Sequence, residues 1–191
     1  MAELGSDLVA LLDAIGTSRA HLCGLSLGGM VSLWVALHHP TRVDRLVVCG
    51  TSAHLGRSKA WRRRSALVRA LGTAAIADSV VERWLTPSYR AAHPELSSEL
   101  AAIVAATPID GYAGGCAAIA GMDLGPCLSA IRVPTLAIAA TEDPETPPEH
   151  LAGIAAAIPR CRMALISRAA HLANLEQPET VTDLVLRHLE G

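Results

Sequence analysis

The sequence predicts an α/β fold, with a mostly parallel sheet that carries helices on both faces and a helical region inserted between its strands. Three observations lead to this prediction. Apolar runs of strand length alternate with segments of helical period near both ends of the chain. The middle, from about residue 51 to residue 131, contains only helical patterns. A glycine-flanked serine stands between a predicted strand and a predicted helix, in the stretch GLSLG.

The composition is that of one globular domain with a sizeable core, because 51% of the 191 residues are hydrophobic. The net charge of −2 gives no reason to expect nucleic acid or an anionic membrane surface as a partner. The five cysteines are widely spaced and odd in number, which argues against a disulfide framework or a zinc site and favours a reducing cytoplasm. The first residues lack the basic region of a signal peptide, and no apolar run is long enough to span a bilayer.

The first predicted element is a helix over residues 6–15, with Ser6 as its N-cap and Gly16 as its stop. A buried strand follows in AHLCGL, and the segment GGMVSLWVALHH then has the pattern of a helix that Pro40 closes. The run RLVVCG is a second apolar strand. A strand, a helix and a strand within so few residues predict a parallel pair joined by a crossover helix.

Regular alternation resumes after the helical middle. TLAIAAT and RMALIS are predicted strands, and a helix follows each, with Pro147 or Pro148 in the first turn of one and Pro178 in the other. The four predicted strands span residues 21–25, 45–49, 135–140 and 162–166. We therefore expect an α/β core formed by residues 1–52 and 128–191, with residues 53–127 as a helical cap or lid.

The stretch GLSLG has the G-x-S-x-G pattern of a nucleophile elbow, the strand-to-helix turn that exposes a serine hydroxyl above a parallel sheet. The glycines at positions 24 and 28 have a steric reason, because Cβ atoms beside the strained serine would collide with the strand and the helix. Ser26 is therefore the predicted nucleophile. The backbone N–H of Leu27, at the start of the helix, is the predicted oxyanion donor.

A nucleophilic serine needs a general base, and the base needs a carboxylate that orients it. The acidic residues of TEDPE follow the third predicted strand, where Asp143 fits the orienting role best and Glu142 is the second choice. His171 is the one histidine of eight that lies after a strand and before the final helix. Serine, acid and histidine thus occur in the order in which α/β hydrolases carry their triad.

Over longer stretches the sequence resembles the 3-oxoadipate enol-lactonases of the α/β-hydrolase superfamily. The resemblance runs over nearly the whole chain and includes ERWLTPSY, ATPIDGYAGGCAAIAGMDL and AAHLANLEQPE. The elbow and the AAHLANLEQP ending are shared with related perhydrolases and esterases, whereas RWLTP and GYAG are more particular to the lactonases. The resemblance implies the α/β-hydrolase fold with a helical cap insertion.

The resemblance also implies a reaction, the hydrolysis of 3-oxoadipate enol-lactone to 3-oxoadipate in the β-ketoadipate route of aromatic catabolism. Ser26 would attack the lactone carbonyl, with His171 as general base and Asp143 orienting it. Water activated by His171 would then release the product from a covalent acyl-enzyme. No organic cofactor and no metal would take part.

Two cap residues are candidates for substrate binding by the same resemblance. Trp84 matches a cap tryptophan that lines the substrate pocket, and Arg83 is a candidate partner for the substrate carboxylate. The arginine run at 62–64 is expected to be a solvated helix face.

The sequence departs from the family at its N-terminus, where a full α/β hydrolase has further strands before the elbow strand. Four strands with their loops and a helix would amount to about 70 residues, so we expect an N-terminally truncated sheet. The elbow strand would then lie at an exposed edge that favours self-association, and the second oxyanion donor would be lost with its loop. A related carboxylesterase or perhydrolase and a catalytically impaired remnant are the alternatives to an enol-lactonase.

Overall fold

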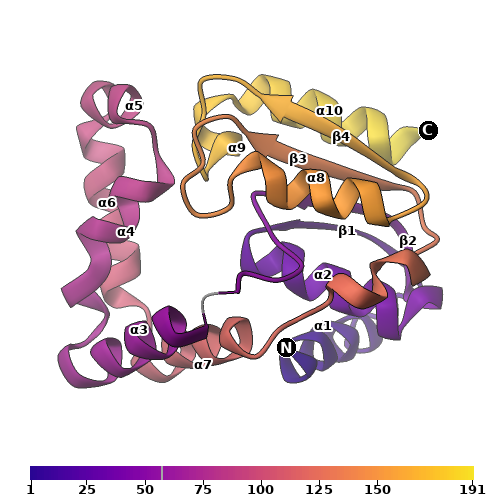
Figure 1. Ribbon diagram of the computed structural model, residues 1–191, viewed down its shortest axis with the longest axis horizontal. Helices are drawn as coiled ribbons and strands as arrows, with labels where there is room; N and C mark the ends of the chain where they lie inside the picture. The colour runs from indigo at the N-terminus through magenta and orange to yellow at the C-terminus, as the bar shows by residue number, and fades with distance from the viewer. Residues whose placement is uncertain (57) are drawn as a thin grey trace.

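The computed structural model describes residues 1–56 and 58–191, and the chain has an α/β part and a helical part (Figure 1). One sheet, ordered β1-β2-β3-β4, is formed by β1 (Ala20–Leu25), β2 (Val43–Cys49), β3 (Thr135–Ala140) and β4 (Cys161–Ile166). All neighbouring strands pair in parallel. The predicted strands and their parallel pairing are therefore confirmed. β1, which leads into the glycine-flanked serine, lies at an edge of the described sheet, as expected.

Helices cover both faces of the sheet, because side chains of its central strands alternate between two apolar cores. Leu46 and Val48 of β2 belong to one core, and Val47 and Cys49 belong to the other. The first core is covered by α1 (Ala2–Ala14), α2 (Leu27–His38) and α8 (Pro148–Ala157). The second is covered by α9 (Ala173–Glu176) and α10 (Pro178–Glu190). Short 3-10 turns connect these elements at η1 (Pro40–Arg42) and η3 (Gly125–Ala130).

The first helix begins earlier than its sequence pattern predicts. α1 starts at Ala2, so Ser6 is an exposed residue inside the helix and not its N-cap, and Gly16 follows the helix end with a φ of +70°. Tertiary packing explains the longer helix. The backbone at Gly5 lies against Trp34 of α2, where an added Cβ would come within 1.9 Å of the indole ring. This contact fixes the first turn of α1 without a capping side chain.

The helical part follows β2 and returns to the sheet before β3. Its elements are α3 (Ser58–Leu71), η2 (Thr73–Ile76), α4 (Ala77–Trp84), α5 (Pro87–Ala92), α6 (Pro94–Ala106) and α7 (Ile109–Ala120). It has a small core of its own, which includes Val68, Val80 and Val104. Figure 1 shows that α4 and α6 lie opposite the carboxyl ends of the strands. α3 and α7 lie side by side near one end of the α4–α6 pair. Residues from both parts can therefore meet at the carboxyl edge of the sheet.

Membrane-spanning length is not reached by any single helix in the described ranges. Within those ranges, α6 and α7 together have the length and composition for it, but the chain bends by 92° between them.

Candidate active site

Ser26 occupies a strained turn between β1 and α2. Its φ of 52° and ψ of −117° lie outside the conformations that non-glycine residues ordinarily adopt. Two hydrogen bonds to the neighbouring segment hold this backbone. The Ser26 N–H donates to the carbonyl of Cys49 at 2.9 Å, and the Thr51 hydroxyl donates to the Ser26 carbonyl at 2.6 Å. Strain that the surroundings maintain in this way is characteristic of residues in functional sites.

The glycines around Ser26 differ in how much space a Cβ atom would have. A Cβ on Gly24 would lie 2.3 Å from the carbonyl carbon of Gly28, so the predicted collision between strand and helix is confirmed there. A Cβ on Gly28 would meet nothing within 4 Å, so the predicted collision at that position is wrong. The crowded position on the helix is Gly29, whose Cβ would come within 2.8 Å of the Thr51 side chain. The close approach is made one residue later because Thr51, in the segment that follows β2, packs against Gly29.

Leu27 is the first residue of α2. Its N–H therefore has no carbonyl partner within the helix, and the positive end of the helix dipole adds to it. A negative charge that develops beside Ser26 would be stabilised by such a donor.

Asp143 and His171 form a buried pair after β3 and β4. Each is 3% exposed, and Oδ2 of Asp143 lies 2.8 Å from Nδ1 of His171. The carboxylate is held by three further donors. Its Oδ1 accepts the N–H groups of Glu145 and Thr146 at 2.8 and 3.0 Å, and its Oδ2 accepts the Thr146 hydroxyl at 2.7 Å. Glu142, the second choice for the acid, is exposed to solvent.

Asp143 is ionised in this environment. Burial alone would raise the pKa of its carboxyl group, but the hydrogen bond to His171, the electrostatic interaction with that residue and the donors of Thr146 outweigh burial, so the pKa lies below its ordinary value. The carboxylate can therefore fix the Nδ1 proton of the imidazole and leave Nε2 free to accept a proton.

Ser26, Leu27 and His171 line one cavity of about 370 Å³ between the two parts of the chain. The α/β part contributes the polar groups at its floor, and the helical part contributes its far wall, which includes Trp61, Trp84 and Tyr112. A cavity of this size with apolar walls and a few convergent polar groups suits a small organic substrate.

The predicted binding residues are placed differently from one another. Trp84 lines the cavity. Arg83 does not line it, because its Nε donates a hydrogen bond to the Glu145 carboxylate. Arg64 of α3 does line it, although the arginine run at 62–64 was expected to be solvated along its length. Helical period explains this difference, since Arg62 and Arg63 are exposed while the next residue turns inward.

Glu176 is a site residue that sequence reasoning missed. Its buried carboxylate joins the helical part to the loop that carries His171. One oxygen accepts the N–H and the hydroxyl of Thr86, at 2.9 and 2.6 Å, and the other accepts the N–H of Ala170 at 2.5 Å. The N–H of Leu172 adds a hydrogen bond to the carbonyl of Trp84 at 2.9 Å. The glutamate lies in NLEQP, where no local pattern marks a buried carboxylate.

A strained serine at a strand-to-helix turn, a buried acid–histidine pair and a helical cap define a class of protein. The family described by the alpha/beta hydrolase fold matches residues 1–178, and the chain belongs to this family. It is a hydrolase of the α/β type, and the predicted fold class and family are thereby confirmed.

Within this family the chain is similar to enol-lactonases. It is 35% identical to 3-oxoadipate enol-lactonase 2 of Acinetobacter baylyi over 183 residues. The aligned segment covers 96% of this chain and 68% of that protein. It superimposes on the crystal structure of the enol-lactonase from Burkholderia xenovorans LB400 with a TM-score of 0.96 and 33% identity, over 100% of this chain and 73% of that one. The putative carbamate hydrolase RutD of Caulobacter sp. strain K31 is 29% identical over 201 residues, covering 100% of this chain and 73% of that protein.

Proposed function

We propose that this chain hydrolyses a small lactone or carboxylic ester by a serine mechanism, and that its substrate is 3-oxoadipate enol-lactone. The observation that carries the proposal is the Asp143–His171 pair, buried beside the same cavity that Ser26 lines. The similarity to the enol-lactonase of Acinetobacter baylyi supports the choice of substrate. The reaction would be a step in the β-ketoadipate route of aromatic-compound catabolism.

The mechanism follows from the roles that the geometry allows. Oγ of Ser26 attacks the lactone carbonyl while Nε2 of His171 accepts the hydroxyl proton, and Asp143 stabilises the imidazolium that forms. The N–H of Leu27 donates to the oxyanion of the tetrahedral intermediate. His171 then returns the proton to the ring oxygen as the carbon–oxygen bond breaks, which leaves an open-chain acyl group on Ser26.

Deacylation repeats these steps with water as the nucleophile. His171 removes a proton from water, the resulting hydroxide attacks the acyl carbonyl, and Ser26 leaves with the proton that His171 carries. The product is the free acid, and the enol released in the first half of the reaction becomes the ketone. No group other than water and the substrate enters the balance.

The first test is labelling of the purified chain with a fluorophosphonate probe, followed by peptide mass spectrometry. Labelling at Ser26 is expected, because such a probe reports an activated serine whatever its natural substrate is. Ser26→Ala should abolish both labelling and ester hydrolysis while the circular dichroism spectrum is retained. A folded chain without labelling would mean that the elbow persists without catalytic machinery, as in a catalytically impaired remnant.

The substrate is tested separately with a panel of the enol-lactone, a simple carboxylic ester and a carbamate. The carbamate is included because of the similarity to the putative carbamate hydrolase RutD. The highest kcat/KM is expected for the enol-lactone. A higher value for the simple ester would assign the chain to the related carboxylesterases, and a higher value for the carbamate would assign it to the carbamate hydrolases.

We further propose a reducing compartment, the cytoplasm, as the place of this reaction. All five cysteines have free thiols, and burial raises the pKa of the Cys49 thiol to about 12. A thiol with such a pKa stays protonated and unreactive near neutral pH.

A further inference from the structure

The turn between α4 and α5, formed by residues 83–86 and called the cap turn below, contacts both loops that carry the buried acid–histidine pair. α4 ends at Trp84, and Thr86 is the N-cap residue of α5. Figure 1 shows this turn on the side of the helical part that faces α9. Leu85 and Thr86 are only 1% and 4% exposed. A segment packed this closely transmits its position to the groups that it contacts.

The cap turn holds the backbone on both sides of His171. The N–H of the preceding residue donates to Glu176, whose carboxylate also accepts the N–H and the hydroxyl of Thr86. The N–H of the following residue donates to the carbonyl of Trp84. Both neighbours of the proposed general base are thus anchored to the cap turn, one directly and one through a single buried carboxylate.

The cap turn also holds the loop of Asp143, through Glu145. The backbone N–H of Glu145 donates to Oδ1 of Asp143 at 2.8 Å, and its carboxylate accepts a hydrogen bond from Nε of Arg83. The Glu145 side chain is 18% exposed, so water screens this ion pair only in part. One residue therefore contacts the orienting acid with its backbone and the cap turn with its side chain.

We propose that the cap turn is a positioning clamp that sets how Asp143 and His171 meet, and that Arg83 and Thr86 are its positioning residues. Among the residues that the structure describes, neither of these two lines the cavity above Ser26, so they act through the loops and not on the substrate. This inference rests on the proposed function, in which the pair supplies the general base and its orienting acid. A misplacement of such a pair by about 1 Å can cost about 100-fold in rate.

The clamp differs from two other roles that the same contacts could have. Because it acts on the base, its loss should slow the hydrolysis of every ester by the same factor. A residue that binds substrate would instead affect esters unequally, according to the acyl group that it contacts. A contact that only stabilises the fold would lower the free energy of unfolding and leave the rate of the folded protein unchanged.

Thr86→Val is the first variant, because it removes the hydroxyl donor to Glu176 and keeps the shape and the backbone N–H of the residue. We expect kcat/KM for 4-nitrophenyl acetate and for 4-nitrophenyl butyrate to fall by the same factor, about tenfold to a hundredfold. Thr86→Ser keeps the hydroxyl and should restore most of the rate. Thr182→Val, at an exposed position of α10, is the matched control and should retain the wild-type rate.

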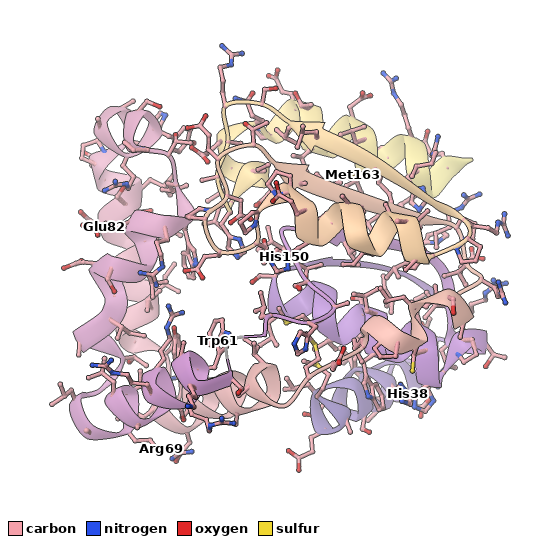
Figure 2. All side chains as sticks on the ribbon, in the orientation of Figure 1. His38, Trp61, Arg69, Glu82, His150 and Met163 are labelled. Atoms are coloured by element: carbon pink, nitrogen blue, oxygen red, sulfur yellow. The ribbon has the colours of Figure 1, made fainter. Side chains whose placement is uncertain are left out.

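Arg83→Met is the second variant, because a partly exposed ion pair can be removed without loss of the fold, and it decides the matter if Thr86→Val does not fold. It should lower kcat/KM for both esters equally, by about threefold to tenfold. Arg83→Lys keeps the charge and should recover part of the loss. Glu82→Gln is the control, because Glu82 is exposed and Figure 2 shows it on the side of the helical part that faces away from the α/β part. Unequal losses for the two esters in Arg83→Met would assign Arg83 to substrate binding.

The hydrogen bond between Asp143 and His171 is observed directly by proton NMR, without a substrate. An Nδ1 proton held between an imidazole and a buried carboxylate resonates far downfield, and its loss in His171→Ala assigns the signal. Thr86→Val and Arg83→Met should shift or broaden this signal, and Thr86→Ser should restore it. Circular dichroism and urea unfolding identify the variants that are folded, so that only folded proteins are compared.

The NMR signal separates this inference from the proposed function. If the signal responds to Thr86→Val or Arg83→Met while the wild type hydrolyses no ester, the proposed function fails and the clamp stands. If esters are hydrolysed but the folded variants keep the wild-type signal and kcat/KM, or Thr182→Val loses as much activity as Thr86→Val, the proposed function stands and the clamp is wrong. A folded wild type with neither the signal nor hydrolysis would overturn both.

Discussion

Asp143→Asn tests the proposed orientation of the general base most directly. Oδ1 of Asp143 accepts the backbone N–H groups of Glu145 and Thr146. In the amide of the variant only the oxygen can accept these hydrogen bonds, so the oxygen must occupy this position. The NH₂ group of the amide then occupies the position of Oδ2, 2.8 Å from Nδ1 of His171. The amide donates to Nδ1, and the imidazole must carry its proton on Nε2. His171 then presents an N–H to Ser26 and cannot accept its proton.

The size of the effect follows from this tautomer. We expect kcat to fall about 10⁴-fold, as the equivalent substitution does in a well-studied serine protease, which corresponds to about 5.5 kcal/mol in the activation barrier. The free energy of unfolding should fall far less. The two backbone donors at Oδ1 exchange a charged acceptor for a neutral one at a cost of about 1 kcal/mol each, so about 2 kcal/mol in total is expected.

Ester hydrolysis and urea unfolding of the same preparation measure both effects. Glu142→Gln is the control, because Glu142 is the adjacent exposed carboxylate and should change kcat by less than about twofold. A kcat for Asp143→Asn within about tenfold of the wild type would refute the tautomer argument. A large loss in Glu142→Gln would move the orienting role to that residue.

Two further predictions concern the stability of the fold. Gly24→Ala should lower the free energy of unfolding by about 3 kcal/mol or more, because its Cβ would collide with the backbone of Gly28. Gly28→Ala should change the free energy of unfolding by less than about 0.5 kcal/mol, because its Cβ would meet nothing within 4 Å. Equal urea midpoints for the two variants would contradict the conclusion that Gly24 is the crowded position. His188 is 2% exposed, neither ring nitrogen has a hydrogen-bond partner within the described residues, and burial lowers its pKa despite the nearby Pro134 and Leu46 carbonyls. His188 therefore binds a proton more weakly in the folded chain than in the unfolded chain, and the free energy of unfolding should fall as the pH drops below about 6.5. His188→Leu should make this fall smaller. If both proteins show the same pH dependence of unfolding, His188 is not its source.

The core strands and the order of the site residues were predictable because they depend on local patterns. β3 is buried at every position and reads as a continuous apolar run, so its bounds agree with the prediction to the residue. Asp143 and His171 each follow a strand, and parallel strands bring their carboxyl ends to the same edge of the sheet. Chain order and strand position were therefore sufficient to select them.

The remaining features depend on contacts between segments distant in the sequence. The early start of α1 is set by Gly5 against Trp34, and the crowding at Gly29 is set by Thr51. The placement of Arg83 outside the cavity wall and of Arg64 in it could not be predicted either. Both guanidinium groups lie near the carboxylate of Glu145, which is distant from them in the sequence. The burial of Glu176 also depends on a distant segment, because Thr86, which donates two hydrogen bonds to its carboxylate, lies 90 residues away in the sequence. No period or motif encodes such pairings.

The hydrogen bonds of Glu176 bear on how this fold can change during evolution. They join Thr86 in the helical part to Ala170, the residue before His171. A helical part inherited from another hydrolase would need a donor pair at the same place, or it would leave a buried carboxylate unpaired next to the general base. Specificity can therefore diverge freely by substitution on α3 and α7, whereas the junction at α4 and α5 must be inherited together with the histidine loop.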